Sequence, residues 1–85
     1  MIKKITQTYN IGVVYFKKKS YKIALECFQN GARQGDSGAL NGLGILYFYG
    51  YGVKQDYIKA KEYYEKSAEQ GNSDALNNLG ILYLV

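Results

Sequence analysis

The sequence predicts an all-α protein in which pairs of helices repeat along the chain, with about five helices in 85 residues. The first observation is an internal repeat: residues 39–49 recur as residues 75–85, 36 positions later, with eight of eleven residues identical. The second is the spacing of apolar residues, which follows the 3.6-residue period of a helix in both copies. The third is the placement of capping residues where these segments begin and end. A repeat of this length is typical of stacked helix pairs.

Each repeat unit is expected to contain two amphipathic helices. The helices are expected at about residues 3–17, 21–34, 38–49, 57–70 and 74–85. In the third of these, the apolar stripe occupies positions i, i+3, i+4 and i+7, on Leu40, Leu43, Gly44 and Tyr47. The fourth helix has its small and aromatic residues on one face and charged residues on the other, which indicates one buried and one solvated side.

Local signals support these helix ends. Ser20, Asp56 and Ser73 precede helical patterns and are the expected N-caps, because their side chains accept hydrogen bonds from the first backbone N–H groups. Gly35 and Gly71 follow the second helices, at the position where a left-handed residue commonly ends a helix.

Two glycines are expected to lie in the middle of helices. Gly44 and Gly80 are equivalent in the repeat, and each costs about 1 kcal/mol of helix stability relative to alanine. Their recurrence suggests that a neighbouring helix comes close, with Ala24 and Ala60 as plausible partners.

The repeat divides the chain into units of one domain spanning residues 1–85. We expect a shortened unit at 3–35, a complete unit at 38–71 and the first helix of an incomplete third unit at 74–85. Gly12 and Tyr15 of the first unit align with the second at an offset of only 32, so this unit lacks four residues.

Composition excludes several kinds of chemistry. The chain has no histidine and a single cysteine, Cys27, so imidazole catalysis and an internal disulfide are impossible. We therefore predict no metal site, no cofactor and no small-molecule substrate. We expect neither a signal peptide nor a membrane segment, because no apolar run approaches about 20 residues. A cytoplasmic protein is expected.

Charge is unevenly distributed along the chain. Residues 1–34 carry +6 and residues 35–85 carry −2. The run Lys17, Lys18 and Lys19 would suit phosphates or an acidic partner, but it is more typical of a solvated turn between helices.

The residues from Leu43 to Ala75 match a known pattern. It reads Leu43-Gly44-x-x-Tyr47-x-x-Gly50-x-Gly52-Val53-x-x-Asp56-x-x-Lys59-Ala60-x-x-Tyr63-Tyr64-x-Lys66-Ser67-Ala68-x-Gln70-Gly71-x-x-x-Ala75. This segment resembles a complete Sel-one-like repeat (SLR), a variant of the tetratricopeptide repeat (TPR). The third unit begins in the same way, whereas the first has the shorter helix spacing of an ordinary TPR.

The resemblance implies a right-handed α-solenoid whose first helices line a concave surface, and a scaffold or adaptor that binds a protein or peptide partner. Alignment with the TPR concave positions gives candidate partner-binding residues Tyr9, Phe16, Lys17, Asn41, Ile45, Phe48, Tyr49, Asn77 and Ile81. The asparagines would bond a peptide backbone and the aromatic residues would act as anchors. Alternatively, Ile45, Phe48, Ile81 and Leu84 simply pack on adjacent helices or on missing neighbours.

Two other functions compete with a binding module. Some cysteine-rich SLR proteins are described as β-lactam hydrolases, but Cys27 aligns with Tyr63 and has no partner cysteine or activating base, so we predict that the protein is not an enzyme. A nucleic-acid or anionic-surface binder would rest on the basic N-terminal half, without a recognised motif.

The open end of the repeat array carries a further expectation. The last helix is predicted to pair with another copy, to dock on a partner, or to continue into further repeats, because stacked repeats need covered ends.

Overall fold

A computed structural model describes residues 2–84, with side chains from Thr8 onward, and this part of the chain forms five helices and no strand. The helices are α1 (Ile2–Lys17), α2 (Tyr21–Arg33), α3 (Ser37–Tyr49), α4 (Tyr57–Glu69) and α5 (Ser73–Leu82), and they make the protein 77% helical. Met1 and Val85, which the expected units 1–85 and 74–85 include, lie outside the described residues.

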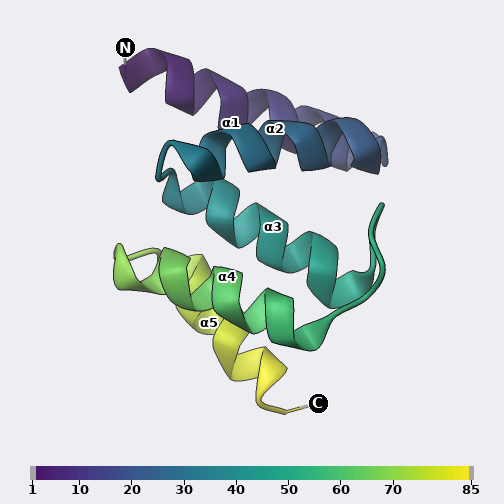
Figure 1. The fold of residues 1–85 in the computed structure, drawn as a ribbon. Coiled ribbons are helices and arrows are strands. Elements are labelled where there is room, and N and C mark those ends of the chain that lie inside the picture. Colours follow the sequence, from purple (N-terminus) through teal and green to yellow (C-terminus); the bar gives the residue numbers. More distant parts are fainter. Residues whose placement is uncertain (1, 85) are drawn as a thin grey trace.

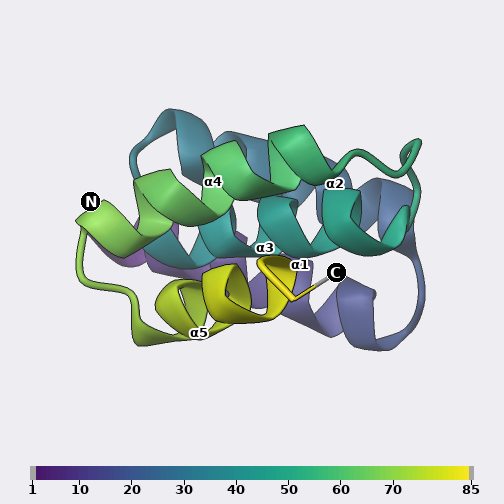
Figure 2. The same ribbon diagram turned by 90° about the horizontal axis from the view of Figure 1, so that it is seen from below.

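The helices stack in sequence order, as Figure 1 shows. Seen along the stack, α2 and α4 lie on one side and α1 and α5 on the other, with α3 between them (Figure 2). The predicted all-α repeat architecture is confirmed. The expected one-sided burial does not hold for every helix. α3 lies between the other helices and is buried on most of its surface rather than along one stripe. On α5, Leu76 and Gly80 of the expected stripe are exposed.

The core lies around α3, the most apolar of the helices. One buried cluster joins α2 and α3; it consists of Ala24, Phe28, Ala39, Leu43 and Leu46. A second cluster joins α3 and α4; it consists of Phe48, Ala60 and Tyr64. Because α3 contributes to both clusters, it holds the two units together.

Aromatic rings of the second helices sit on glycines of the first helices. A Cβ added at Gly12 would lie 2.7 Å from the Phe28 ring, and one added at Gly44 would lie within 3.0 Å of the Tyr64 ring. The predicted close approach at Gly44 is therefore confirmed. The covering group is the ring of Tyr64 rather than Ala60, which lies one turn earlier on α4.

The same prediction was wrong for Gly80, which is exposed and would have no atom within 4 Å of its added Cβ. The reason is positional. The described residues contain no helix after α5 that would carry the covering ring.

Three side chains cap the helix N-termini. They are Asp36, Asp56 and Asn72, which accept hydrogen bonds from the backbone N–H groups of Ala39, Lys59 and Ala75 at 3.0, 3.1 and 3.0 Å. Asp56 was predicted. Ser73 is instead the first residue of α5, and Ser20 makes no capping hydrogen bond. Gly35 and Gly71 have φ of 82° and 88°, which confirms the expected left-handed ends.

The last helix ends three residues earlier than expected, at Leu82, and Leu84 is 87% exposed. In α3 the corresponding turn is held from outside, because the Gln55 side chain donates to the Phe48 carbonyl at 2.7 Å and the Asp56 N–H donates to the Tyr47 carbonyl at 2.9 Å. Within the described residues, no segment does this for α5.

The connection between α3 and α4 reaches back to the first unit, as the green strap in Figure 1 shows. Tyr51 in this connection stacks on Tyr21 of α2, with ring centroids 4.6 Å apart and planes 8° from parallel. Gly50 and Gly52 have positive φ, 73° and 74°, which turns the chain toward α2. The connection between α1 and α2 is shorter, and Lys19 turns it with a φ of 63°.

Candidate functional site

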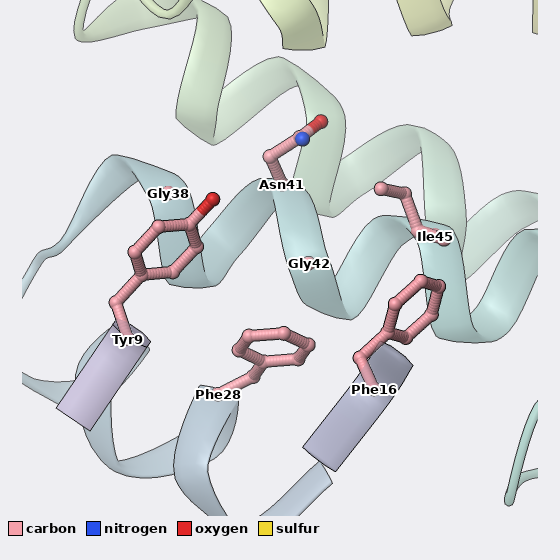
Figure 3. A pocket seen from close by; sticks show the side chains of 7 residues that line it. All are labelled: Tyr9, Phe16, Phe28, Gly38, Asn41, Gly42 and Ile45. Carbon is pink, nitrogen blue, oxygen red and sulfur yellow. The ribbon is translucent and has the colours of Figure 1, made fainter. Parts of the chain in front are cut away.

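A pocket of about 50 Å³ lies between α1 and α3, with the ring of an α2 residue at its base (Figure 3). Its lining residues are Tyr9, Phe16, Phe28, Gly38, Asn41, Gly42 and Ile45. Four of the nine candidate residues from the sequence therefore meet here: Tyr9, Phe16, Asn41 and Ile45.

Helix periodicity brings these side chains together. Tyr9 and Phe16 are seven positions apart and lie on the same side of α1, two turns from each other. Asn41 and Ile45 are four positions apart on α3 and face them, as Figure 3 shows. The pocket is thus walled by two helices of adjacent units.

Glycines on α3 keep the pocket narrow by letting rings approach. A Cβ at Gly42 would lie 2.8 Å from the Phe28 ring, and one at Gly38 would lie 2.9 Å from Tyr9. The rings of Tyr9 and Phe28 are also in contact, with centroids 6.0 Å apart. Any side chain larger than hydrogen at these two positions would push the pocket walls apart.

Two polar groups stand at this otherwise apolar pocket. Asn41 is 8% exposed, and its Oδ1 accepts a hydrogen bond from Asn78 Nδ2 at 2.9 Å, which ties α3 to α5. Burial raises the pKa of Tyr9, with smaller contributions from the carboxylates of Asp36 and Asp74. The Tyr9 hydroxyl therefore stays protonated and remains a hydrogen-bond donor.

The structure keeps three of the other candidates apart from the pocket. Lys17 is exposed at the end of α1. Phe48 is only 9% exposed, because the rings of Tyr49 and Tyr57 cover it at centroid distances of 4.8 and 5.2 Å. Tyr49 is 53% exposed and stacks on Tyr51, 5.2 Å away. Phe48 thus lies in the core, as the packing alternative had it.

The last two candidates lie on α5 and do not reach the pocket. Asn77 is exposed and Ile81 is 46% exposed. The residue of α5 that contacts the site is instead Asn78, which sequence reasoning missed. Its signal was the departure of Asn78 from Gly42 in an otherwise matching repeat.

Nucleophilic chemistry has little support in the described residues. Burial raises the pKa of the Cys27 thiol, and the nearby Glu26 carboxylate raises it further, so the thiol stays protonated. Cys27 does not line the pocket. Among residues 8–84, no cluster of histidine, cysteine, aspartate or glutamate could hold a metal ion.

The lysine run follows Phe16 along the chain. Lys17 ends α1, Lys18 and Lys19 lie in the turn after it, and all three are exposed. The ammonium group of Lys18 stands 5.9 Å from the centre of the Tyr15 ring. Tyr9, two turns earlier on α1, is close enough to Asp36 and Asp74 for their charges to affect its pKa. Basic residues therefore follow Phe16, whereas acidic charges act on Tyr9.

Stacked helix pairs, with rings of each second helix seated on glycines of the first, define a helical repeat solenoid protein. A family model described as the Sel1 repeat matches residues 8–36, 37–72 and 73–85, and the chain belongs to this family. The resemblance noted from the motif is thus confirmed. No curated protein matches the chain.

Family membership sets the general kind of function. Sel1 repeats are generally protein-interaction modules, and the family is typically a non-catalytic scaffold. In the part of the chain that the structure describes, the helices are too short or too polar to cross a membrane.

Proposed function

We propose that the protein is an adaptor module that binds a peptide segment of a partner protein on the face formed by α1, α3 and α5. The observation that carries this proposal is the pocket between α1 and α3, at which Tyr9, Phe16, Asn41 and Ile45 meet. A volume of about 50 Å³ exceeds the roughly 10–15 Å³ that one water requires. It is far below the roughly 300–1,000 Å³ of small-molecule sites, so a single apolar side chain suits it best.

The polar groups would fix the backbone of such a segment. The protonated Tyr9 hydroxyl is able to donate a hydrogen bond, and the Asn41 Nδ2 has no hydrogen bond within the described residues. Both groups would bond carbonyl oxygens on either side of the inserted side chain, while Phe16 and Ile45 supply apolar contact. Pockets for side chains combined with backbone hydrogen bonds are a common mode of peptide recognition.

Charge favours an acidic segment near the lysine run that follows Phe16. Lys17, Lys18 and Lys19 follow Phe16 and are exposed. A partner with an apolar anchor and acidic residues on the Phe16 side would place opposite charges together and would keep acid away from Asp36 and Asp74. Such pairing mainly sets orientation and association rate.

A display library of random peptides, selected on the immobilised chain, tests this proposal. Selected peptides should carry an apolar residue next to acidic residues. Ile45→Gln makes one pocket wall polar and should weaken their binding about tenfold, equivalent to about 1.4 kcal/mol. Ile58→Gln is the matched control, because Ile58 is 73% exposed on α4, away from the pocket. Equal affinities of the two variants would contradict the proposed site.

Two further measurements address the competing functions. The first is an assay with a chromogenic β-lactam. If the protein hydrolyses it and Cys27→Ser abolishes this hydrolysis, the prediction that the protein is not an enzyme is wrong. Binding of a mixed-sequence RNA that falls steeply with salt, and that is lost when the three lysines become glutamine, would favour an anionic polymer as the ligand instead.

A further inference from the structure

Two surface grooves of the protein are related by one repeat. The inner groove, of about 360 Å³, is lined by Gln29, Ala32, Arg33, Leu40, Leu43, Tyr63 and Lys66. The end groove, of about 450 Å³, is lined by Glu65, Ala68, Glu69, Leu76 and Leu79. Each residue of the end groove lies 36 positions after one of the inner groove. The end groove has no counterpart of Tyr63 and Lys66, the two residues that α4 contributes to the inner groove.

Beside the inner groove, two neighbouring aromatic rings of α4 pack this helix against α3. Tyr63 stacks on Tyr47, with centroids 5.8 Å apart and planes 19° from parallel. Tyr64 covers Gly44, where an added Cβ would lie within 3.0 Å of the ring. The first unit has the equivalent of the Tyr64–Gly44 contact, with the ring of Phe28 over Gly12. In both units, a ring of the second helix therefore covers the equivalent glycine of the first helix.

The two receiving positions at the end of the stack are Gly80 on α5 and Tyr83 directly after it. Gly80 would have no atom within 4 Å of an added Cβ. Tyr83 is 65% exposed, with the Lys61 ammonium group 5.8 Å from its ring centroid, as Lys59 lies 5.1 Å from the ring of the equivalent Tyr47. Leu76 is 57% exposed, whereas its equivalent Leu40 is 7% exposed under α4. The outer surface of α5 therefore has the shape and apolar residues that receive a helix elsewhere in the same molecule.

Charge distinguishes the end groove from the inner groove. The inner groove has Gln29 and Arg33 where the end groove has Glu65 and Glu69. In the inner groove, α4 directs Lys66 toward this position. An incoming helix with a basic residue there would meet two carboxylates rather than an arginine, so the end groove favours a basic helix more strongly.

The same features argue against a second copy of this chain as the occupant. Two end grooves facing each other would bring Glu65 and Glu69 of both copies together. The opposite end of the stack exposes Ile11, Val14 and Ile23 among its described side chains, and none of these is a ring for Gly80.

We propose that the end groove, with Gly80 and Tyr83, binds an amphipathic helix of a partner protein. This helix carries two adjacent aromatic residues and a lysine or arginine on the same face. One ring stacks on Tyr83, the other lies on Gly80, and the basic group faces Glu65 and Glu69. This site lies beyond α5 and is separate from the pocket of the proposed function.

A synthetic peptide with the sequence of residues 53–72 is the probe, because α4 provides this chemistry in the inner groove. The peptide is capped at both ends, and its binding to the intact protein is measured by isothermal titration calorimetry. We expect binding that weakens at least tenfold when the peptide carries Tyr64→Ala, since the ring over Gly80 is lost. The peptide with Lys66→Glu should also bind more weakly, and added salt should reduce the difference.

Gly80→Ala in the protein is the decisive variant. The added methyl group meets nothing in the free protein, so the thermal midpoint should be equal to or above that of the unmodified chain. It would occupy the place of the incoming ring, so peptide binding should fall at least tenfold. Asn77→Ala is the control and should leave peptide affinity unchanged, because Asn77 is exposed and does not line the end groove.

Three outcomes would overturn the proposal. The first is no peptide binding at a concentration of several hundred micromolar. The second is equal binding to the unmodified protein and to Gly80→Ala. The third is a dimer of the intact chain that Gly80→Ala dissociates, without peptide binding, which would assign the groove to a second copy.

Discussion

Replacing Gly44 with alanine adds one methyl group at the closest contact between α3 and α4. The added Cβ would lie within 3.0 Å of the Tyr64 ring, a separation that real Cβ atoms essentially never show. The ring has little freedom to retreat, because Tyr64 is 2% exposed and packs with Ala60 and Phe48. The substitution should therefore force the two helices apart.

Two opposing effects set the magnitude. Alanine favours the helix by about 1 kcal/mol relative to glycine. Overpacking of a tight core costs about 1–3 kcal/mol, and a fully buried ring places this site near the upper value. Gly44→Ala should thus lower the free energy of unfolding by about 2 kcal/mol and the thermal midpoint by roughly 10 °C. Gly80→Ala experiences only the helix effect and should raise the free energy of unfolding by about 1 kcal/mol.

Urea unfolding followed by far-ultraviolet circular dichroism measures both changes. The difference between the two variants mainly reports the steric effect, because the chemical change is the same and both glycines are helical. Gly80 lies in the last turn of α5, so its gain in helix stability is at most that of an interior position such as Gly44. Similar changes at Gly44 and Gly80 would refute the idea that the Tyr64 ring is wedged on Gly44. A further check is Tyr64→Leu, which should destabilise the Gly44→Ala variant less than the unmodified protein, since contacting residues couple.

Other parts of the structure allow sharper tests of single side chains. Asp56→Ala should lower the free energy of unfolding by about 1 kcal/mol, whereas Ser20→Ala, which removes no capping hydrogen bond, should leave urea unfolding nearly unchanged. Burial raises the pKa of Tyr64 above the ordinary 10.0, so the folded state holds this proton more tightly than the unfolded state. Stability should be complete below pH 10.0 and fall as the pH rises above it, and urea unfolding across this range should show a smaller fall in Tyr64→Phe. Burial also raises the pKa of Cys27, so its reaction with a thiol reagent at neutral pH should be slow, and Glu26→Gln should speed it; an unchanged rate would contradict the part assigned to Glu26.

The helix boundaries could be predicted from the sequence where local chemistry determines them. Gly35 and Gly71 ended their helices as expected, because left-handed backbone at these positions favours glycine. Neighbouring polar residues compete for the capping position: Asn72 rather than Ser73 caps α5, just as the equivalent Asp36 rather than Ser37 caps α3. α5 ends at Leu82 although its residues nearly repeat those of α3, and the described residues include no segment that contacts its last turn as Gln55 and Asp56 contact that of α3.

The pocket could be predicted in part. Tyr9 and Phe16, and likewise Asn41 and Ile45, share a face by helix periodicity alone, so alignment of the repeats places them correctly on their own helices. The base of the pocket comes from Phe28, on the other helix of the unit, and no pattern within α1 or α3 indicates it. The exposed fraction of Phe48 depends on the position of the Tyr57 ring at the start of α4. The connection between α3 and α4 sets this position, and helix periodicity does not predict it.

The connection between α3 and α4 also bears on how this chain tolerates rearrangement. Tyr51 stacks on Tyr21 of the preceding unit, so the longer connection joins α3 to α4 and also contacts the unit before them. The first unit lacks the corresponding four residues. Its connection between α1 and α2 therefore has no equivalent of Tyr51 to contact a unit placed before it. A repeat grafted before α1 would be held by helix faces alone, whereas one grafted after α5 with its own long connection could clasp Tyr57, the counterpart of Tyr21 on α4. The contact that this connection makes between units therefore runs in one direction along the stack.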